Sequence, residues 1–199
     1  MAYLSSPSGS RLRGRYRVSG STALGLGGNF SAGSQHLFQF RWSDSTRLAG
    51  IRSVSLCANT TVAFASGGAS QFDLFKATAW TVQGSGGTAL DVGSQNKMRT
   101  SSPASVSVAG DIRIAPNSAL TAGTVTFETN AISTFVINTQ STVGQYVLPT
   151  FLYYAPGGDD DSPLTLGFQE GFVVKYTTAI ATGQFIASVS VEWSEYEPS

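Results

Sequence analysis

Apolar and polar residues alternate one by one through much of this chain, and this pattern constrains its fold more than any other feature. Residues 36–42, 171–176 and 185–193 all show the alternation. Because successive side chains of a strand point to opposite faces of a sheet, each segment predicts an antiparallel strand with one buried face. The residues that we expect in the core are Phe38, Phe40, Trp42, Phe172, Val174, Tyr176, Val189, Val191 and Trp193.

The rest of the chain offers further strands and turns but no helical pattern. No window of about 11 residues carries apolar side chains at the i, i+3, i+4, i+7 spacing of a helix. Most of the 22 glycines fall between candidate strands, where tight turns favour them. Many short strands separated by turns predict an all-β fold, an antiparallel β-sandwich that is jelly-roll-like. The further candidate strands are 50–58, 60–65, 71–82, 123–128, 132–138 and 149–154.

The N-terminal segment differs in composition from the rest of the chain. Residues 1–35 are rich in Gly and Ser and predict an extended N-terminal arm, followed by a single β-sandwich domain over residues 36–199. The arm carries Arg11, Arg13, Arg15 and Arg17, whose spacing of two would place them on one face of an extended chain. Guanidinium groups bind carboxylates and phosphates well, so we expect these arginines to bind a partner subunit. A solvated tail is the alternative.

Charge is scarce and unevenly distributed. Charged residues make up 12% of the chain and the formal net charge is zero, so we do not expect nucleic acid as a partner. A weakly charged surface repels its own copies poorly, which favours a homo-oligomer. Residues 1–58 hold seven arginines and one acid, whereas residues 159–199 hold seven acids and one lysine. The two ends could attract each other between copies, or neutralise each other within one fold.

The sequence offers little for catalysis. The single histidine, His36, has no G-x-S-x-G nucleophile motif to accompany it, and the single cysteine, Cys57, lies in an apolar stretch that predicts a buried thiol. We expect Asp159, Asp160 and Asp161 to form an exposed turn that holds no ion, because their spacing lacks a calcium-loop pattern. We therefore expect no enzyme, no catalytic residue, no cofactor and no metal.

The C-terminal residues 171–199 read GFVVKYTTAIATGQFIASVSVEWSEYEPS. This ending resembles that of small jelly-roll virion proteins of tailed bacteriophages, the capsid cement (decoration) class and its relatives. The resemblance implies a structural virion protein, a capsid cement or minor capsid subunit. Such a subunit would stabilise a viral shell through contacts with the major capsid protein or other virion subunits.

The remaining expectations concern localisation and alternative functions. The N-terminus lacks the apolar segment of a signal peptide, and no apolar run reaches the ~20 residues of a membrane span, so we expect synthesis in a host cytoplasm and residence in the virion. One alternative is a tail-fibre or spike module that binds a glycan receptor, and another is a jelly-roll coat subunit. The aromatic residues that could stack on a sugar are Trp80, Tyr153, Tyr154 and Trp193.

Overall fold

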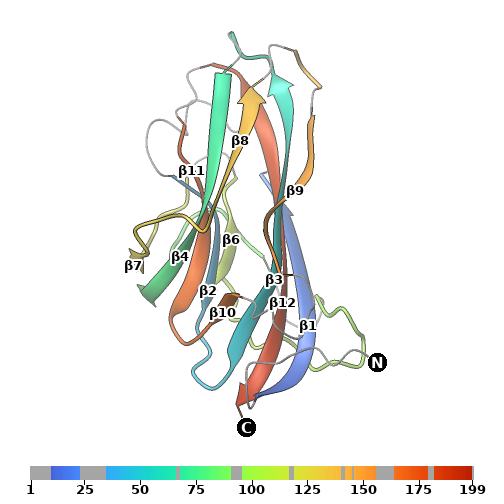
Figure 1. The fold of residues 1–199 in the computed structure, drawn as a ribbon, viewed down its shortest axis with the longest axis vertical. Helices are drawn as coiled ribbons and strands as arrows, with labels where there is room; N and C mark the ends of the chain where they lie inside the picture. Colours follow the sequence, from blue (N-terminus) through green and yellow to red (C-terminus); the bar gives the residue numbers. More distant parts are fainter. Residues whose placement is uncertain are drawn as a thin grey trace.

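The chain folds into two antiparallel sheets that pack face to face, as Figure 1 shows for a computed structural model. The structure describes residues 10–22, 35–65, 68–90, 96–116, 119–139, 142–144, 146–155, 164–178 and 182–198. These residues form strands and turns without a helix, so the predicted antiparallel β-sandwich is confirmed.

The first sheet, sheet A, has the order β1-β12-β3, with β9 and β10 both pairing with the far edge of β3. The second, sheet B, has the order β5-β6-β2-β11-β4, with β7 and β8 both pairing with the far edge of β4. Sheet A contains β1 (Ser10–Ser21), β3 (Leu48–Val62), β9 (Tyr146–Tyr154), β10 (Leu164–Leu166) and β12 (Gln184–Pro198). Sheet B contains β2 (Gln35–Trp42), β4 (Gly68–Val82), β5 (Thr88–Ala89), β6 (Ile112–Ile114), β7 (Thr124–Phe127), β8 (Ser133–Thr139) and β11 (Glu170–Tyr176).

Successive long strands alternate between the two sheets. The chain passes from β1 in sheet A to β2 in sheet B, then to β3 and β4, and it crosses again between β8 and β9, between β10 and β11 and between β11 and β12. Strands that pair within a sheet are therefore far apart in the sequence, and Ser10 of β1 lies opposite Pro198 of β12. This connectivity places the first and last described strands side by side in sheet A.

Aromatic side chains fill the space between the sheets. The Phe40 ring stacks on Phe172 within sheet B at 5.2 Å between centroids, and it meets the edge of Trp193 from sheet A at 5.4 Å. All the core residues expected from the sequence are at most 1% exposed, so this prediction is confirmed. Aromatic pairs of this geometry contribute about 0.5–1.5 kcal/mol each beyond the burial of their area.

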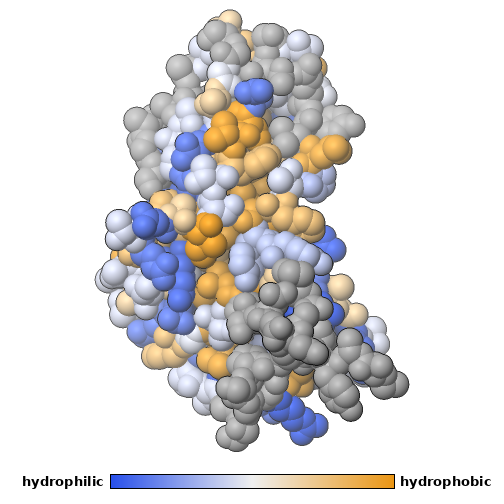
Figure 2. Space-filling view, in the orientation of Figure 1, coloured by the Kyte–Doolittle hydropathy of each residue, from blue (hydrophilic) through white to orange (hydrophobic). Residues whose placement is uncertain are grey.

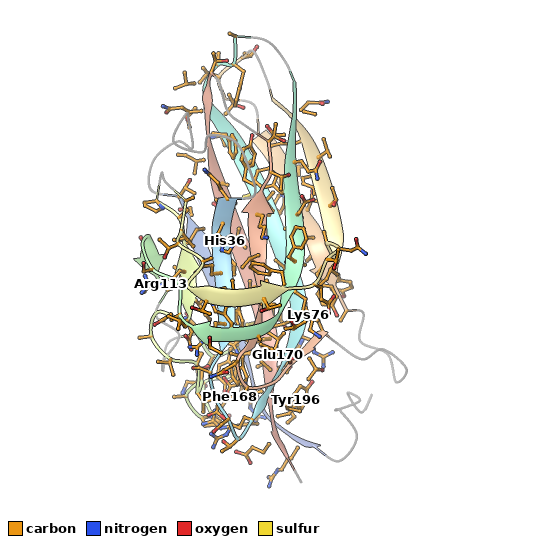
Figure 3. The ribbon with its side chains drawn as sticks, turned by 90° about the vertical axis from the view of Figure 1, so that its left-hand side faces the viewer. His36, Lys76, Arg113, Phe168, Glu170 and Tyr196 are labelled. Atoms are coloured by element: carbon orange, nitrogen blue, oxygen red, sulfur yellow. The ribbon has the colours of Figure 1, made fainter. Side chains whose placement is uncertain are left out.

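A second, smaller core lies on the outer face of sheet B. Figure 3 looks onto this face, where β7 and the last part of β4 run across the direction of the other strands. Trp80 of β4 and Val173 of β11 are completely buried here, and Val125 and Phe127 of β7 pack against their cluster. Gly171 makes room for the indole, because a Cβ at this position would come within 2.9 Å of Trp80 Cε3. One face of sheet B is thus closed by the chain itself.

The structure corrects the expected N-terminal arm. Residues 10–21 form β1, whose Tyr16 and Val18 are 0% and 5% exposed and belong to the main core. Arginines alternate here with residues that include these apolar side chains, which is the pattern of a half-buried strand, and pairing with β12 satisfies the backbone groups on one side of β1. A boundary at residue 35 is therefore wrong for residues 10–22, while residues 1–9 and 23–34 lie outside the described residues.

Smaller differences concern strand limits. The two candidates 50–58 and 60–65 are one strand, β3, and the short strands β6 and β10 were not expected because three residues are too few to show a period. The segment 84–108, expected to be a loop with at most a brief strand at its end, has its short strand near its start, as β5.

The aromatic layer makes a stability prediction. We expect Phe40→Ala to lower the free energy of unfolding by about 3–5 kcal/mol, because it opens a cavity between the sheets. Phe151→Ala is the matched control, since Phe151 is 58% exposed and should cost less than about 1 kcal/mol. Urea unfolding followed by tryptophan fluorescence measures both, and equal losses would contradict the assigned core.

Candidate assembly surface

The four N-terminal arginines do not share one face. The register of β1 against β12 shifts between Leu12 and Gly14, so the side chains on the two sides of this irregularity do not keep one alternation. Arg15 and Arg17 lie opposite Ser194 and Glu192 on the outward face of sheet A. Arg13 instead bonds Glu195, which lies on the same side of β12 as the core residue Trp193. A β-bulge of this kind cannot be read from a spacing of two.

Glu195 is completely buried, and several donors surround its carboxylate. Arg13 Nη1 lies 2.6 Å from Oε2, while Ser105 Oγ and the Val106 backbone N–H donate to Oε1 at 2.5 and 3.1 Å. The same Arg13 nitrogen donates to the Ala104 carbonyl oxygen at 2.7 Å. A buried carboxylate needs such partners, because an unpaired buried charge is strongly unfavourable. The pair therefore ties the segment 103–108 to the end of sheet A.

Tyr16 adds a second link between this segment and the sheet. Its hydroxyl donates to the Pro103 carbonyl oxygen at 3.1 Å, and its ring stacks on Trp193 at 5.6 Å. Burial, followed by the nearby charge of Glu195, raises the pKa of Tyr16 to about 12. The hydroxyl therefore keeps its proton and remains a donor at neutral pH.

The outward face of sheet A carries small polar side chains on three neighbouring strands. We call it the serine face, and define it by Ser19 on β1, Ser188 and Ser190 on β12, and Ser53 and Ser55 on β3. These residues lie next to one another across the strands, and the Ser19 and Ser190 hydroxyl oxygens are 2.6 Å apart. Short side chains leave the backbone of three strands close to the surface, so another surface could approach it closely.

Aromatic side chains border the serine face on β9. Phe151 and Tyr154 lie opposite Ser55 and Ser53, are 58% and 59% exposed, and contact each other with ring centroids 5.1 Å apart. Leu148 on the same strand is 65% exposed. A large exposed apolar side chain on its own is ordinary, whereas a group of them on one strand makes this edge a candidate interaction surface.

The edges of the two sheets meet without charged side chains. Neither β8 nor β9 contains a charged residue, although edge strands usually carry charge to prevent association. Figure 2 shows a band of apolar side chains down the middle of the molecule. In the same orientation in Figure 1, β8 and β9 lie at the upper half of this band. Pro149 removes one backbone donor from β9, so contacts there would involve side chains rather than strand pairing.

Charged groups border the serine face on the opposite side, at β1. Arg15 Nη2 pairs with Glu192 Oε1 at 2.7 Å. Arg11 and Arg17 are exposed, and among the described residues neither forms an ion pair. The structure thus pairs Arg13 and Arg15 with acids of the same chain, whereas Arg11 and Arg17 form no ion pair with the residues that the structure describes. The expected binding of a partner by these residues remains a prediction.

Cys57 lies beside the serine face. It is opposite Ser188 and partly exposed, which corrects the expectation of a buried thiol. The alternation of β3 explains the error, because odd-numbered residues from Ser53 to Cys57 point outward while Val54, Leu56 and Ala58 point into the core.

His36 lies on β2 of the other sheet, where its ring contacts Phe127 of β7 (Figure 3). Its Nδ1 is 2.9 Å from Gln39 Nε2, and its ring meets the edge of Phe127. Lys175 Nζ sits 3.9 Å from the centroid of the same Phe127 ring. Burial, followed by the positive charge of Lys175, lowers the pKa of His36 to about 4. The imidazole is neutral at pH 7, and among the described residues its hydrogen-bond partner is an amide rather than a nucleophile.

The other residues considered from the sequence are dispersed. Trp80 and Trp193 are completely buried, Tyr153 is half-buried and Tyr154 is exposed, so these four do not form a surface for stacking sugars. The acidic turn Asp159–Asp161 lies outside the described residues. Sequence reasoning missed Phe151, whose exposure depends on the edge position of β9.

Comparison with known proteins adds no assignment. No protein-family model and no curated protein matches the chain. Within the described ranges, no three His, Cys, Asp or Glu side chains come together as a potential metal site. The same residues include no helix of the length and hydropathy required to cross a membrane.

The buried ion pair Arg13–Glu195 should have a larger coupling energy than the more exposed ion pair Arg15–Glu192. In a double-mutant cycle, Arg13→Met and Glu195→Gln should show a coupling energy above about 1 kcal/mol, as for contacting groups in a buried network. The exposed pair, with Arg15→Met and Glu192→Gln, is the matched control and should show less than about 1 kcal/mol. Equal couplings from urea unfolding would contradict the role of Glu195.

Stability should depend on pH through His36. The pKa of about 4 lies below the ordinary value of 6.5, so the unfolded chain binds the proton more readily. The stability that depends on a neutral His36 is fully present above pH 6.5. As the pH falls towards 4, this effect lowers the free energy of unfolding by up to about 3 kcal/mol. His36→Gln should weaken this dependence in urea unfolding measured from pH 7 to 4. An unchanged pH profile would refute the assignment.

Proposed function

We propose that the chain is a structural virion protein, a capsid cement (decoration) or minor capsid subunit, that attaches to a viral shell through the serine face and its aromatic border. The observation that carries the proposal is this surface itself. It combines rows of serines, the exposed Phe151 and Tyr154, and neighbouring edge strands without charged residues. Protein interfaces are enriched in aromatic side chains at their centre and depleted in Lys and Glu.

The connectivity of the strands supports the same proposal. The strands alternate between the two sheets, with β1 beside β12 and β2 beside β11, and this arrangement supports the proposed jelly-roll-like connectivity. Jelly rolls occur in viral capsid proteins and in lectins. The resemblance of residues 171–199 to phage virion proteins favours the capsid, and the burial of Trp80 and Trp193 removes two aromatic residues that a glycan site would use.

The mechanism is thermodynamic rather than chemical. A subunit that binds the assembled shell and not its free components stabilises the shell by mass action. The weakly charged surface also favours contacts between copies of the chain on the shell. Arg11 and Arg17 would contribute at the rim, where each ion pair is worth about 0–1 kcal/mol.

One substitution on each sheet tests the proposal. Ser55→Arg places a long charged side chain in the serine face and should reduce binding to shells of the encoding virus at least tenfold. Thr124→Arg, on exposed β7 of sheet B, is the matched control and should bind normally. Co-sedimentation with purified shells measures binding, and unchanged urea midpoints establish that both variants fold.

A labelling experiment tests the same surface independently. Cys57 is the single cysteine of the chain and is partly exposed, so a maleimide reagent should label the free protein. Attachment to the shell should slow the labelling at least several-fold, because Cys57 adjoins the serine face. Equal rates in the free and bound protein, or normal binding by Ser55→Arg, would reject this surface.

A further inference from the structure

We propose that sheet A carries a binding site for a small oxyanion, a carboxylate or phosphate group, at the end of its outward face next to Ser194. Three buried polar atoms there have no hydrogen-bond partner: Arg15 Nε, Arg52 Nη2 and Tyr196 Oη. They come from the neighbouring strands β1, β3 and β12. Arg52 and Tyr196 are only 6% and 1% exposed as whole residues.

The strand register brings these residues together. Arg15 lies directly opposite Ser194, and Arg52 Nε donates to Ser194 Oγ at 3.4 Å. Tyr196 follows two positions along β12 and therefore points to the same side of the sheet. Its position near the end of β12 can be followed in Figure 3. The residue of β3 opposite Ser194 is Gly50, which contributes no side chain next to Ser194.

The charges of the arginines at this site favour the binding of an anion. Glu192 is paired with Arg15, and within the described part of the chain no carboxylate lies within ion-pair distance of Arg52. A buried guanidinium without a counter-ion is strongly unfavourable, and each unsatisfied buried donor adds to the penalty. An oxyanion would accept hydrogen bonds from both arginines and from the tyrosine hydroxyl, which are the donors that carboxylate and phosphate groups prefer.

The residues that flank the acidic segment 159–161 in the sequence are attached to β3 beside Arg52. The Ala155 N–H donates to the Arg52 carbonyl oxygen at 2.8 Å, and Leu164 pairs with Ile51. Both ends of the segment that includes Asp159, Asp160 and Asp161 are therefore attached beside Arg52. We assign the site to an oxyanion from outside the chain, and this assignment holds whether or not the protein binds a viral shell.

The test uses inorganic phosphate and acetate as probes at constant low ionic strength. Thermal unfolding and isothermal titration should show saturable binding to the wild-type protein. Arg52→Met should weaken binding at least tenfold and Tyr196→Phe several-fold, because each removes one unpartnered donor. Arg17→Met is the matched control, since it removes an exposed arginine on the same face and should bind like the wild type.

The outcomes separate the possible sources of the oxyanion. Tighter binding of phosphate assigns the site to a phosphate group, and tighter binding of acetate assigns it to a carboxylate. No saturable binding to the wild type, or equal binding by Arg52→Met, would overturn the proposal. Binding that appears only in the triple variant Asp159→Asn, Asp160→Asn, Asp161→Asn would also overturn it, because the chain's own carboxylates would then fill the site.

Discussion

The contact between Phe40 and Trp193 joins the two sheets, and the rest of the sandwich depends on it. Phe40 comes from β2 and stacks on Phe172 of β11, while Trp193 comes from β12 and stacks on Tyr16 of β1. Rings from four strands thus form one continuous aromatic layer across the interface of the sheets. Because a packed interior has few voids, this layer fixes the distance and register at which the two outward faces are presented.

Electrostatics has a second, more local role in this weakly charged protein. The excess of arginine near the N-terminus and of acid near the C-terminus is partly neutralised within the chain, because β1 and β12 are neighbours. Arg13 reaches the buried Glu195, which in turn holds the segment around Ser105 and Val106. The alternative that the chain ends neutralise each other within one fold therefore applies to these pairs, while Arg11 and Arg17 remain exposed.

The two faces of the sandwich differ in what they can do. Sheet B is partly covered by its own chain, where β7 packs against Trp80 and His36. Sheet A exposes serines bordered by Phe151 and Tyr154, and towards the end of β12 it buries donors that lack partners. The proposed assembly role uses the first part of this face, and the proposed oxyanion site uses the second. Both depend on the outward direction of alternate residues in the same strands.

The alternation of apolar residues determined by itself that this chain forms strands, that the strands have one buried face, and that Phe40, Trp42 and Trp193 lie in the core. These are local properties, because a period of two indicates a strand whose side chains alternate between two faces. Tertiary structure decided the rest. Arg13 does not share a face with Arg15, because a bulge lies between them. Residues 10–21 form β1 because they pair with an edge of β12. Phe151 is exposed because β9 is an edge strand. Pairing partners, bulges and edges arise from contacts between residues far apart in sequence, and no local pattern encodes them.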